Sequence, residues 1–138
     1  MDEKVIATFD QSLRRCDNEP RFLDIFYERF LESSPKVKEK FADTDFAKQK
    51  RLLRASFYLI VLAAEDPENG PERYLQYLAE RHSARDLKIG SELYDLWLDS
   101  LLETVEECDP EYSPEVEKAW EQMMEIGIDY MLRKYHRR

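Results

Sequence analysis

The sequence predicts an all-α fold, and three observations support that prediction. Only 3 of the 138 residues are Gly and 6 are Pro, whereas 43% are hydrophobic and 12% are aromatic. Few turn formers and many large side chains favour long helices over a sandwich of short strands. Apolar residues also recur at intervals of three and four, and no segment alternates with a period of two. We therefore expect six substantial helices and one short one, folded as a single domain over residues 1–138.

Each expected helix carries one apolar stripe. In chain order, the first four are Ile6, Phe9 and Leu13; Phe22, Phe26 and Phe30; the short segment 37–41; and Leu53, Phe57, Ile60 and Ala64. The last three are Leu75, Leu78, Ala79 and His82; Tyr94, Trp97, Leu98, Leu101 and Val105; and Val116, Ala119, Trp120, Met123, Gly127 and Tyr130. Because residues at these spacings share one face of a helix, every segment has one side to bury against the others.

Polar residues mark the expected helix boundaries. Four pairs are typical helix starts: Ser34-Pro35, Thr44-Asp45, Ser91-Glu92 and Ser113-Pro114. A capping oxygen accepts a hydrogen bond from a free backbone N–H, Pro suits the first helical position, and an acid favours the positive end of the helix dipole. The segment 66–71, DPENGP, is the strongest predicted loop, and Asp109-Pro110 marks another break.

The charge balance argues against two classes of partner. Lys and Arg number 21 against 30 Asp and Glu, so the net charge at pH 7 is −9. Such a chain does not suit a phosphate backbone or an anionic lipid surface. The longest apolar run, residues 57–64, is too short to span a membrane, and the acidic N-terminus does not resemble a signal peptide. We therefore expect no nucleic-acid or membrane partner, and a cytoplasmic location.

One histidine has clear potential for chemistry. His82 continues the apolar stripe of its helix and is expected to point inward, whereas His136 lies in the basic tail and is expected to be solvated. No second His and no carboxylate cluster completes a metal site around His82, and Cys16 and Cys108 lie 92 positions apart without a CxxC motif. An inward His is often a hydrogen-bonded core residue. It can also bind a metal whose other ligands come from a macrocycle, as in haem.

Two polar side chains interrupt stripes that are otherwise apolar. Tyr27 adds one hydroxyl to an aromatic stripe, and Gln49 lies one helical turn before Leu53. A pocket that binds O₂ at haem iron needs dry walls and one or two hydrogen-bond donors. The same spacing also fits a core tyrosine whose hydroxyl reaches the rim and a glutamine on the helix surface. Spacing alone leaves both interpretations open.

Several stretches, in the right order and spacing, resemble bacterial globins. They are FYERF at 26–30, Ser34-Pro35, VKEKF at 37–41, ADTDFAKQ at 42–49, LAERH at 78–82 and Ala119-Trp120. The first four resemble flavohaemoglobin globin domains and truncated haemoglobins, and the last two look like the proximal and final helices of the flavohaemoglobin type. The resemblance extends from about residue 22 to the C-terminus, and residues 1–18 fit an additional first helix. It implies the globin fold, a three-over-three helical sandwich around a haem pocket.

The resemblance also implies a role for each candidate site residue. It makes His82 the proximal iron ligand, Tyr27 the distal hydroxyl donor and Gln49 the distal amide. Apolar contacts to the haem are expected from Phe41, Leu53, Phe57, Leu78 and either Tyr94 or Trp97. The expected partners of the haem propionates are Lys50, Arg54, Arg85 and Lys88.

The function that the resemblance implies is that of a bacterial haemoglobin, which binds O₂, NO and CO reversibly at the ferrous iron of haem b. A Tyr/Gln pair fits tight O₂ binding and nitric oxide dioxygenation. The chain ends at Arg138 without a flavin or nicotinamide module, so such a reaction would need a separate reductase. Two alternatives stay open: a haem-free globin-like sensor, and a helical interaction module whose aromatic stripes are all core. The sequence does not distinguish a monomer from a homodimer.

Overall fold

The computed structural model of the chain describes residues 2–81 and 91–136, which form seven helices and no strands. The helices are α1 (Glu3–Asp17), α2 (Phe22–Glu32), α3 (Pro35–Lys40), α4 (Phe46–Glu65), α5 (Gly70–Arg81), α6 (Ser91–Cys108) and α7 (Pro114–His136). The prediction of an all-α fold with six substantial helices and one short one is confirmed within these residues. None of these helices combines the length and apolar character that a membrane span requires.

Helix boundaries follow the predicted caps. The Ser34 hydroxyl accepts a hydrogen bond from the Lys36 N–H at 3.2 Å, and Asp45 accepts one from the Lys48 N–H at 3.2 Å. One boundary differs from the prediction, since α5 begins at Gly70 inside the expected loop 66–71. The Gly70 N–H donates to the Asp66 carbonyl at 2.6 Å, and the proline that follows fits the first turn of a helix.

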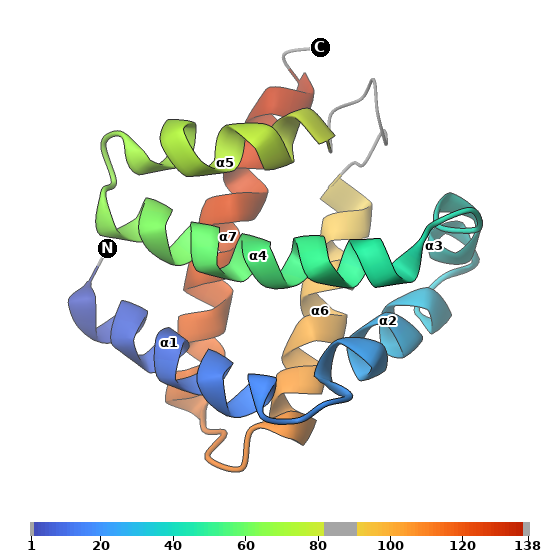
Figure 1. Ribbon diagram of the computed structural model, residues 1–138, viewed down its shortest axis with the longest axis horizontal. Helices are drawn as coiled ribbons and strands as arrows, with labels where there is room; N and C mark the ends of the chain where they lie inside the picture. Colours follow the sequence, from blue (N-terminus) through green and yellow to red (C-terminus); the bar gives the residue numbers. More distant parts are fainter. Residues whose placement is uncertain (1, 82–90, 137–138) are drawn as a thin grey trace.

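Three helices pack on three. The layer of α1, α4 and α5 crosses in front of α6 and α7 in Figure 1, and α7 contacts all three of its members. Helix α2 packs on α6 and carries α3 at its end. Because α1 and α4 run in opposite directions, the end of α1 lies beside the middle of α4.

The core is centred on Trp120, which is fully buried. The ring of Trp120 meets those of Phe9, Phe22 and Phe57 edge-on, with centroids 4.6, 6.3 and 5.5 Å away. These four rings come from α7, α1, α2 and α4, and edge-to-face pairs contribute about 0.5–1.5 kcal/mol each beyond their buried area. One aromatic cluster therefore joins four helices.

A polar network lies beside this cluster and ties the first helix to the turn between α6 and α7. The buried Asp109 carboxylate accepts hydrogen bonds from the Ser12 hydroxyl at 2.6 Å and from Arg15 at 2.6 and 3.0 Å. The indole N–H of Trp120 donates to Ser12 at 2.9 Å, and the Glu111 amide donates to Asp109 at 2.8 Å. Each buried polar group of the network thus has a partner.

Helices α4 and α5 approach each other closely at Gly70. A Cβ atom built on Gly70 would lie 2.5 Å from the carbonyl oxygen of Ala63 and 2.7 Å from its Cα. Both of these are backbone atoms, so a side chain at position 70 would have to move a helix. Glycine therefore sets the separation of the two helices at this end.

Candidate functional site

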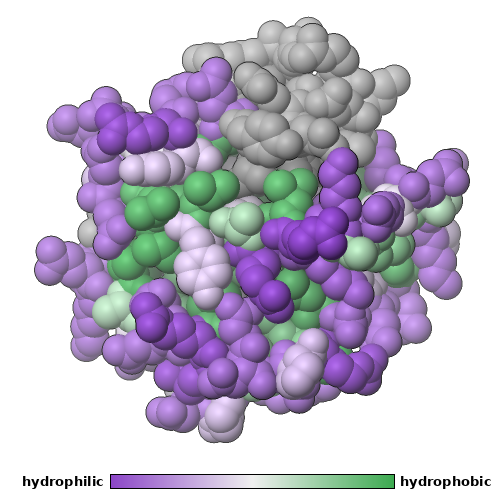
Figure 2. Space-filling view, in the orientation of Figure 1, coloured by the Kyte–Doolittle hydropathy of each residue, from purple (hydrophilic) through white to green (hydrophobic). Residues whose placement is uncertain are grey.

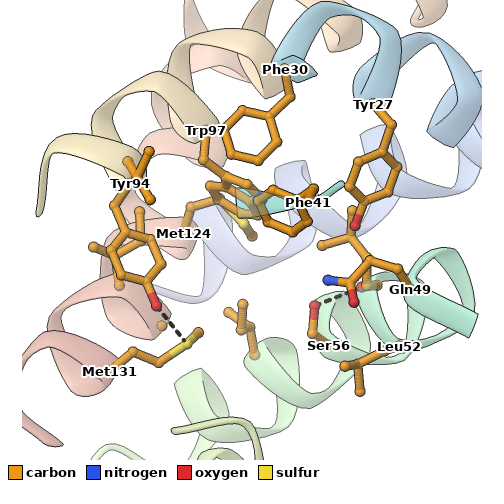
Figure 3. Close-up of a pocket in the computed structure, with 15 residues that line it drawn as sticks. Tyr27, Phe30, Phe41, Gln49, Leu52, Ser56, Tyr94, Trp97, Met124 and Met131 are labelled. Atoms are coloured by element: carbon orange, nitrogen blue, oxygen red, sulfur yellow. Dashed lines mark hydrogen bonds between the residues drawn. The ribbon is translucent and has the colours of Figure 1, made fainter. Parts of the chain in front are cut away.

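A pocket with largely apolar walls opens between α2, α4, α6 and α7, with Phe41 at the end of α3 (Figure 3). It contains about 740 Å³ of space, including the part that is open to solvent. Its lining residues are Tyr27, Phe30, Phe41, Gln49, Leu52, Leu53, Ser56, Ile60, Leu93, Tyr94, Trp97, Met124, Gly127, Ile128 and Met131. Four of these carry a hydroxyl or an amide, and the others are apolar. A pocket with few polar groups in apolar walls is typical of a cofactor or small-molecule site.

The first polar group of the pocket is the Tyr27 hydroxyl. Tyr27 is only 4% exposed, and its ring meets those of Phe26 and Phe46 edge-on at 4.9 and 5.3 Å. Its hydroxyl points toward the side chain of Gln49 (Figure 3). Burial raises the pKa of the Tyr27 phenol, and a hydrogen bond with Gln49 acts in the opposite direction. The hydroxyl therefore keeps its proton at neutral pH and can donate it to a ligand in the pocket.

Aromatic rings form the wall beside Tyr27. Phe41 is 8% exposed and meets the ring of Phe30 edge-on at 5.5 Å. Phe30 stacks on Phe26 at 5.7 Å, and Phe26 in turn meets Trp97 of α6 at 5.9 Å. These ring contacts join α2, α6 and the end of α3 into one aromatic wall.

A second phenol lies at the other side of the pocket. The Tyr94 hydroxyl donates to the sulfur of Met131 at 3.4 Å, which joins the start of α6 to α7 (Figure 3). Burial raises the pKa of Tyr94 as well, so it too stays protonated. The Ser56 hydroxyl donates to the Leu53 carbonyl at 2.6 Å within α4. Tyr94 and Ser56 thus already have partners within the protein.

Three of the predicted site residues whose side chains the structure describes, Lys50, Arg54 and Phe57, do not line this pocket. Lys50 forms an ion pair with Asp24, which lowers the pKa of that carboxyl. Arg54 lies 3.5 Å from Asp17, and both cations point to the rim of α4 that faces α1 and α2. Phe57 packs in the Trp120 cluster. Leu78 belongs to α5, but its side chain lies outside what the structure describes.

Three of the predicted residues, His82, Arg85 and Lys88, lie outside the described residues. The predicted residues that do line the pocket are Tyr27, Phe41, Gln49, Leu53, Tyr94 and Trp97. Within residues 2–81 and 91–136, no three His, Cys, Asp or Glu side chains are grouped to bind a metal ion.

Sequence reasoning missed several lining residues. Leu52 and Ser56 lie three and seven positions after Gln49, so the helical period could have placed them on the same face. Ile128 and Met131 of α7 gave no such signal, because their place in the pocket depends on how α7 crosses α4. Gly127 is informative in retrospect, since its missing side chain leaves room next to Ile60.

Comparisons with known proteins agree with this geometry. A family model described as Globin matches residues 24–131. A solved structure from Pseudomonas aeruginosa PAO1, described as structurally highly homologous to a human haemoglobin, is 40% identical to this chain. That match covers 95% of this chain and 98% of the other, with a TM-score of 0.87. No curated protein matches the chain. The resemblance noted in the sequence is confirmed, and the chain belongs to the globin family.

Proposed function

We propose that this globin is a haem-binding bacterial haemoglobin that binds O₂ and related diatomic gases reversibly, as a single domain over residues 1–138. The observation that carries the proposal is the buried Tyr27 hydroxyl beside Gln49 in a pocket with largely apolar walls. The aromatic and aliphatic walls fit a flat, largely apolar macrocycle. When bound, haem supplies a ferrous iron to which a diatomic gas binds.

The residues of this chain would divide the work of binding haem. Phe41, Leu53 and Trp97 would contact the macrocycle, and His82 is the proposed proximal ligand. The apolar walls exclude water from the pocket, and this would limit oxidation of a ferrous iron bound there. Tyr27 keeps its proton and offers it to the ligand, while Gln49 orients the Tyr27 hydroxyl. Some ligands, such as O₂, gain negative charge when they bind. A buried hydrogen-bond donor stabilises such a ligand more than one that stays apolar.

A Tyr/Gln pair that retains O₂ also suits the dioxygenation of nitric oxide, and this is the finer part of the proposal. That activity would require a reductase as the source of electrons. The pocket itself does not distinguish this activity from O₂ storage, since both use the same donors.

The experiment that tests haem binding compares the two histidines of the chain. We expect stoichiometric haem binding, with a sharp Soret band, in the wild type and in His136→Ala. His82→Ala should bind haem weakly or require added imidazole. Haem retention by His82→Ala that equals the wild type would rule out His82 as the ligand.

The same titration separates the proposal from its rivals. A haem-free sensor or a helical interaction module would remain folded by circular dichroism but would show no Soret shift when haem is added. Haem binding by a folded wild type therefore excludes both alternatives.

A further inference from the structure

The outward face of α4 is exposed apart from its contacts with Asp17 of α1. Its exposed side chains recur every three or four positions and include Lys48, Arg51, Tyr58, Leu62 and Glu65. Tyr58 and Leu62 are 41% and 42% exposed, although both are large and hydrophobic. In the shared view of Figures 1 and 2, α4 crosses the middle of the visible face, where strongly hydrophilic and apolar side chains adjoin.

Charge changes sign along this face. Lys48 and Arg51 lie near the start of α4, whereas Glu65 ends the helix and Glu68 follows it. None of these four side chains forms an ion pair within residues 2–81 and 91–136. The face is therefore positive at one end and negative at the other.

The middle of the face is neutral and held in place. Asp17 of α1 accepts a hydrogen bond from the Tyr58 hydroxyl at 2.8 Å and lies 3.5 Å from Arg54. The charge of Arg54 is thus balanced within the chain, and the ring of Tyr58 has a fixed orientation. What remains exposed in the middle is the Tyr58 ring, Leu62 and the small Ala55.

The acidic end continues onto α1. A groove between α1 and α4 is lined by apolar residues and by Glu3, Asp10, Arg14 and Glu65. Arg14 is paired with Asp10 at 3.1 Å, so Glu3 and Glu65 leave the groove negative. A cationic side chain that reached the end of α4 would find both of these carboxylates.

The spacing of these residues is symmetric about Tyr58. Arg51 and Glu65 each lie seven residues from Tyr58, about two helical turns in opposite directions. Lys48 extends the positive end of α4, and Glu68 lies in the turn just beyond the negative end. When α4 is placed antiparallel to a second α4 about an axis at Tyr58, Arg51 of each copy faces Glu65 of the other copy. A parallel arrangement would place like charges together.

We propose that this face of α4 is a self-association surface, on which a second copy of the chain packs antiparallel about a twofold axis near Tyr58. A twofold interface requires one patch that is complementary to itself, and this charge order meets that requirement. Arg54 and Leu62 each lie four residues from Tyr58, so the aliphatic stem of Arg54 covers Leu62 of the other copy. Ala55 allows the two helices to approach closely. A foreign partner would need no such symmetry.

The first test is the concentration dependence of mass in sedimentation velocity. We expect a reversible dimer to form at concentrations below about 1 mM, where an association worth 4 kcal/mol becomes measurable. A wild type that stays monomeric up to this concentration would overturn the proposal and leave the face to solvent or to another partner.

Charge reversal then tests the arrangement. Glu65→Arg and Arg51→Glu should each weaken the dimer by about tenfold, because either change places like charges opposite each other twice. The double variant should recover wild-type association, since it restores both pairs with their signs exchanged. Glu125→Arg, on an exposed position of α7, is the matched control and should not weaken the dimer.

Comparing Glu65→Arg with Glu125→Arg distinguishes the effect of local charge pairing on the dimer from the effect of net charge. The chain carries −9, so replacing any glutamate with arginine lowers the overall repulsion between copies. Glu65→Arg is expected to weaken association despite that gain. A dimer that strengthens in Glu65→Arg as much as in Glu125→Arg would contradict the antiparallel arrangement.

Disulfide cross-linking tests whether the twofold axis lies near Tyr58. In Tyr58→Cys, the new thiols of the two copies lie close enough to form a disulfide when oxidised glutathione accepts their two electrons. We expect this disulfide-linked dimer to form much faster than that of Glu125→Cys. Equal rates in the two variants would place the axis elsewhere and refute the proposal.

Discussion

At the scale of single residues, Tyr27 combines burial, an edge-on aromatic setting and a hydroxyl directed at Gln49. Removing that hydroxyl leaves the ring and its packing in place. A hydrogen bond to a charged group contributes roughly 1.5–3 kcal/mol. In the haem-loaded protein, Tyr27→Phe should therefore release O₂ about 10–150-fold faster in stopped-flow measurements, at 1.4 kcal/mol per tenfold change.

Two comparisons test whether the effect belongs to this hydroxyl. Tyr94→Phe removes the other buried phenol of the pocket, whose hydroxyl donates to Met131, and should change O₂ release little. Carbon monoxide gathers less charge when bound and should respond much less than O₂ to Tyr27→Phe. An unchanged O₂ release rate in Tyr27→Phe would mean that Tyr27 serves only as core.

Asp109 is the residue on which the acid stability of the chain should depend. Burial by itself raises its pKa, but hydrogen bonds from Arg15, Ser12 and the Glu111 amide outweigh burial and hold the pKa below its ordinary value of 3.8. A lowered pKa contributes stability that is present above pH 3.8 and is lost as the pH falls through the folded-state value. Wild type should therefore lose free energy of unfolding in this acid range more steeply than Asp109→Asn.

Asp109→Asn should lower the free energy of unfolding at neutral pH by roughly 1.5–3 kcal/mol, as measured by urea denaturation. The matched control is Asp10→Asn, which breaks the more exposed ion pair with Arg14. Exposed pairs contribute about 0–1 kcal/mol, so this control should be close to wild type. Equal losses in the two variants would contradict the importance assigned to the buried network.

At the scale of elements, the close approach of α4 and α5 depends on Gly70. The nearest atoms to a new Cβ are backbone atoms of Ala63, which move only with the helix. Gly70→Ala should therefore destabilise the fold by about 1–3 kcal/mol, as overpacking does elsewhere. The check is the midpoint of urea unfolding at constant slope.

Gly127→Ala provides the contrast. Its Cβ would meet the flexible end of Ile60 at 3.1 Å, and alanine favours a helix by about 0.8–1 kcal/mol over glycine. We expect unchanged or higher stability and a narrower pocket with weaker haem binding. A stability loss as large as that of Gly70→Ala would show that Ile60 cannot move aside.

Helices and their starts could be predicted because their causes are local. The Ser34 and Asp45 caps each act over two or three residues, and they lie where the sequence places them. The propionate role of Lys50 and Arg54 stays a prediction, because it depends on tertiary packing rather than on a local pattern. Their observed partners, Asp24 and Asp17, lie on other helices, so only the packing of α4 on α2 and α1 decides where these cations point.

Likewise, only those pocket residues that a local pattern marks could be predicted from the sequence. Tyr27 and Gln49 stood out because each is a polar residue on an apolar stripe, and both line the pocket. The residues of α7 in the pocket, such as Met131, are not distinguished by any local pattern. Likewise, the bond between Ser12 and Asp109 joins residues 97 positions apart, and no spacing rule connects them.

At the scale of the whole molecule, the pocket and the Asp109 network lie at opposite ends of α6. Tyr94 is in the first turn of that helix, and Asp109 directly follows its last residue. The Trp120 cluster packs beside the network, where each ring and each buried polar group has close partners. The pocket end has ring contacts of its own, but its side chains also surround open space, which the Trp120 end does not.

This uneven packing has a consequence for motion. Local opening costs least where side chains have the fewest close neighbours, so it should begin at the pocket end. In the chain prepared without haem, amide hydrogens of α3 and early α4 should exchange much faster than those of α1 and of α7 near Trp120. Added haem should slow exchange mainly at the pocket end, since a ligand stabilises the folded state to which it binds. Uniform exchange in both preparations would contradict this. If exchange follows the expected pattern, the globin pocket is the part of the molecule that becomes fully ordered when haem binds, while the core around Trp120 is already stable without it.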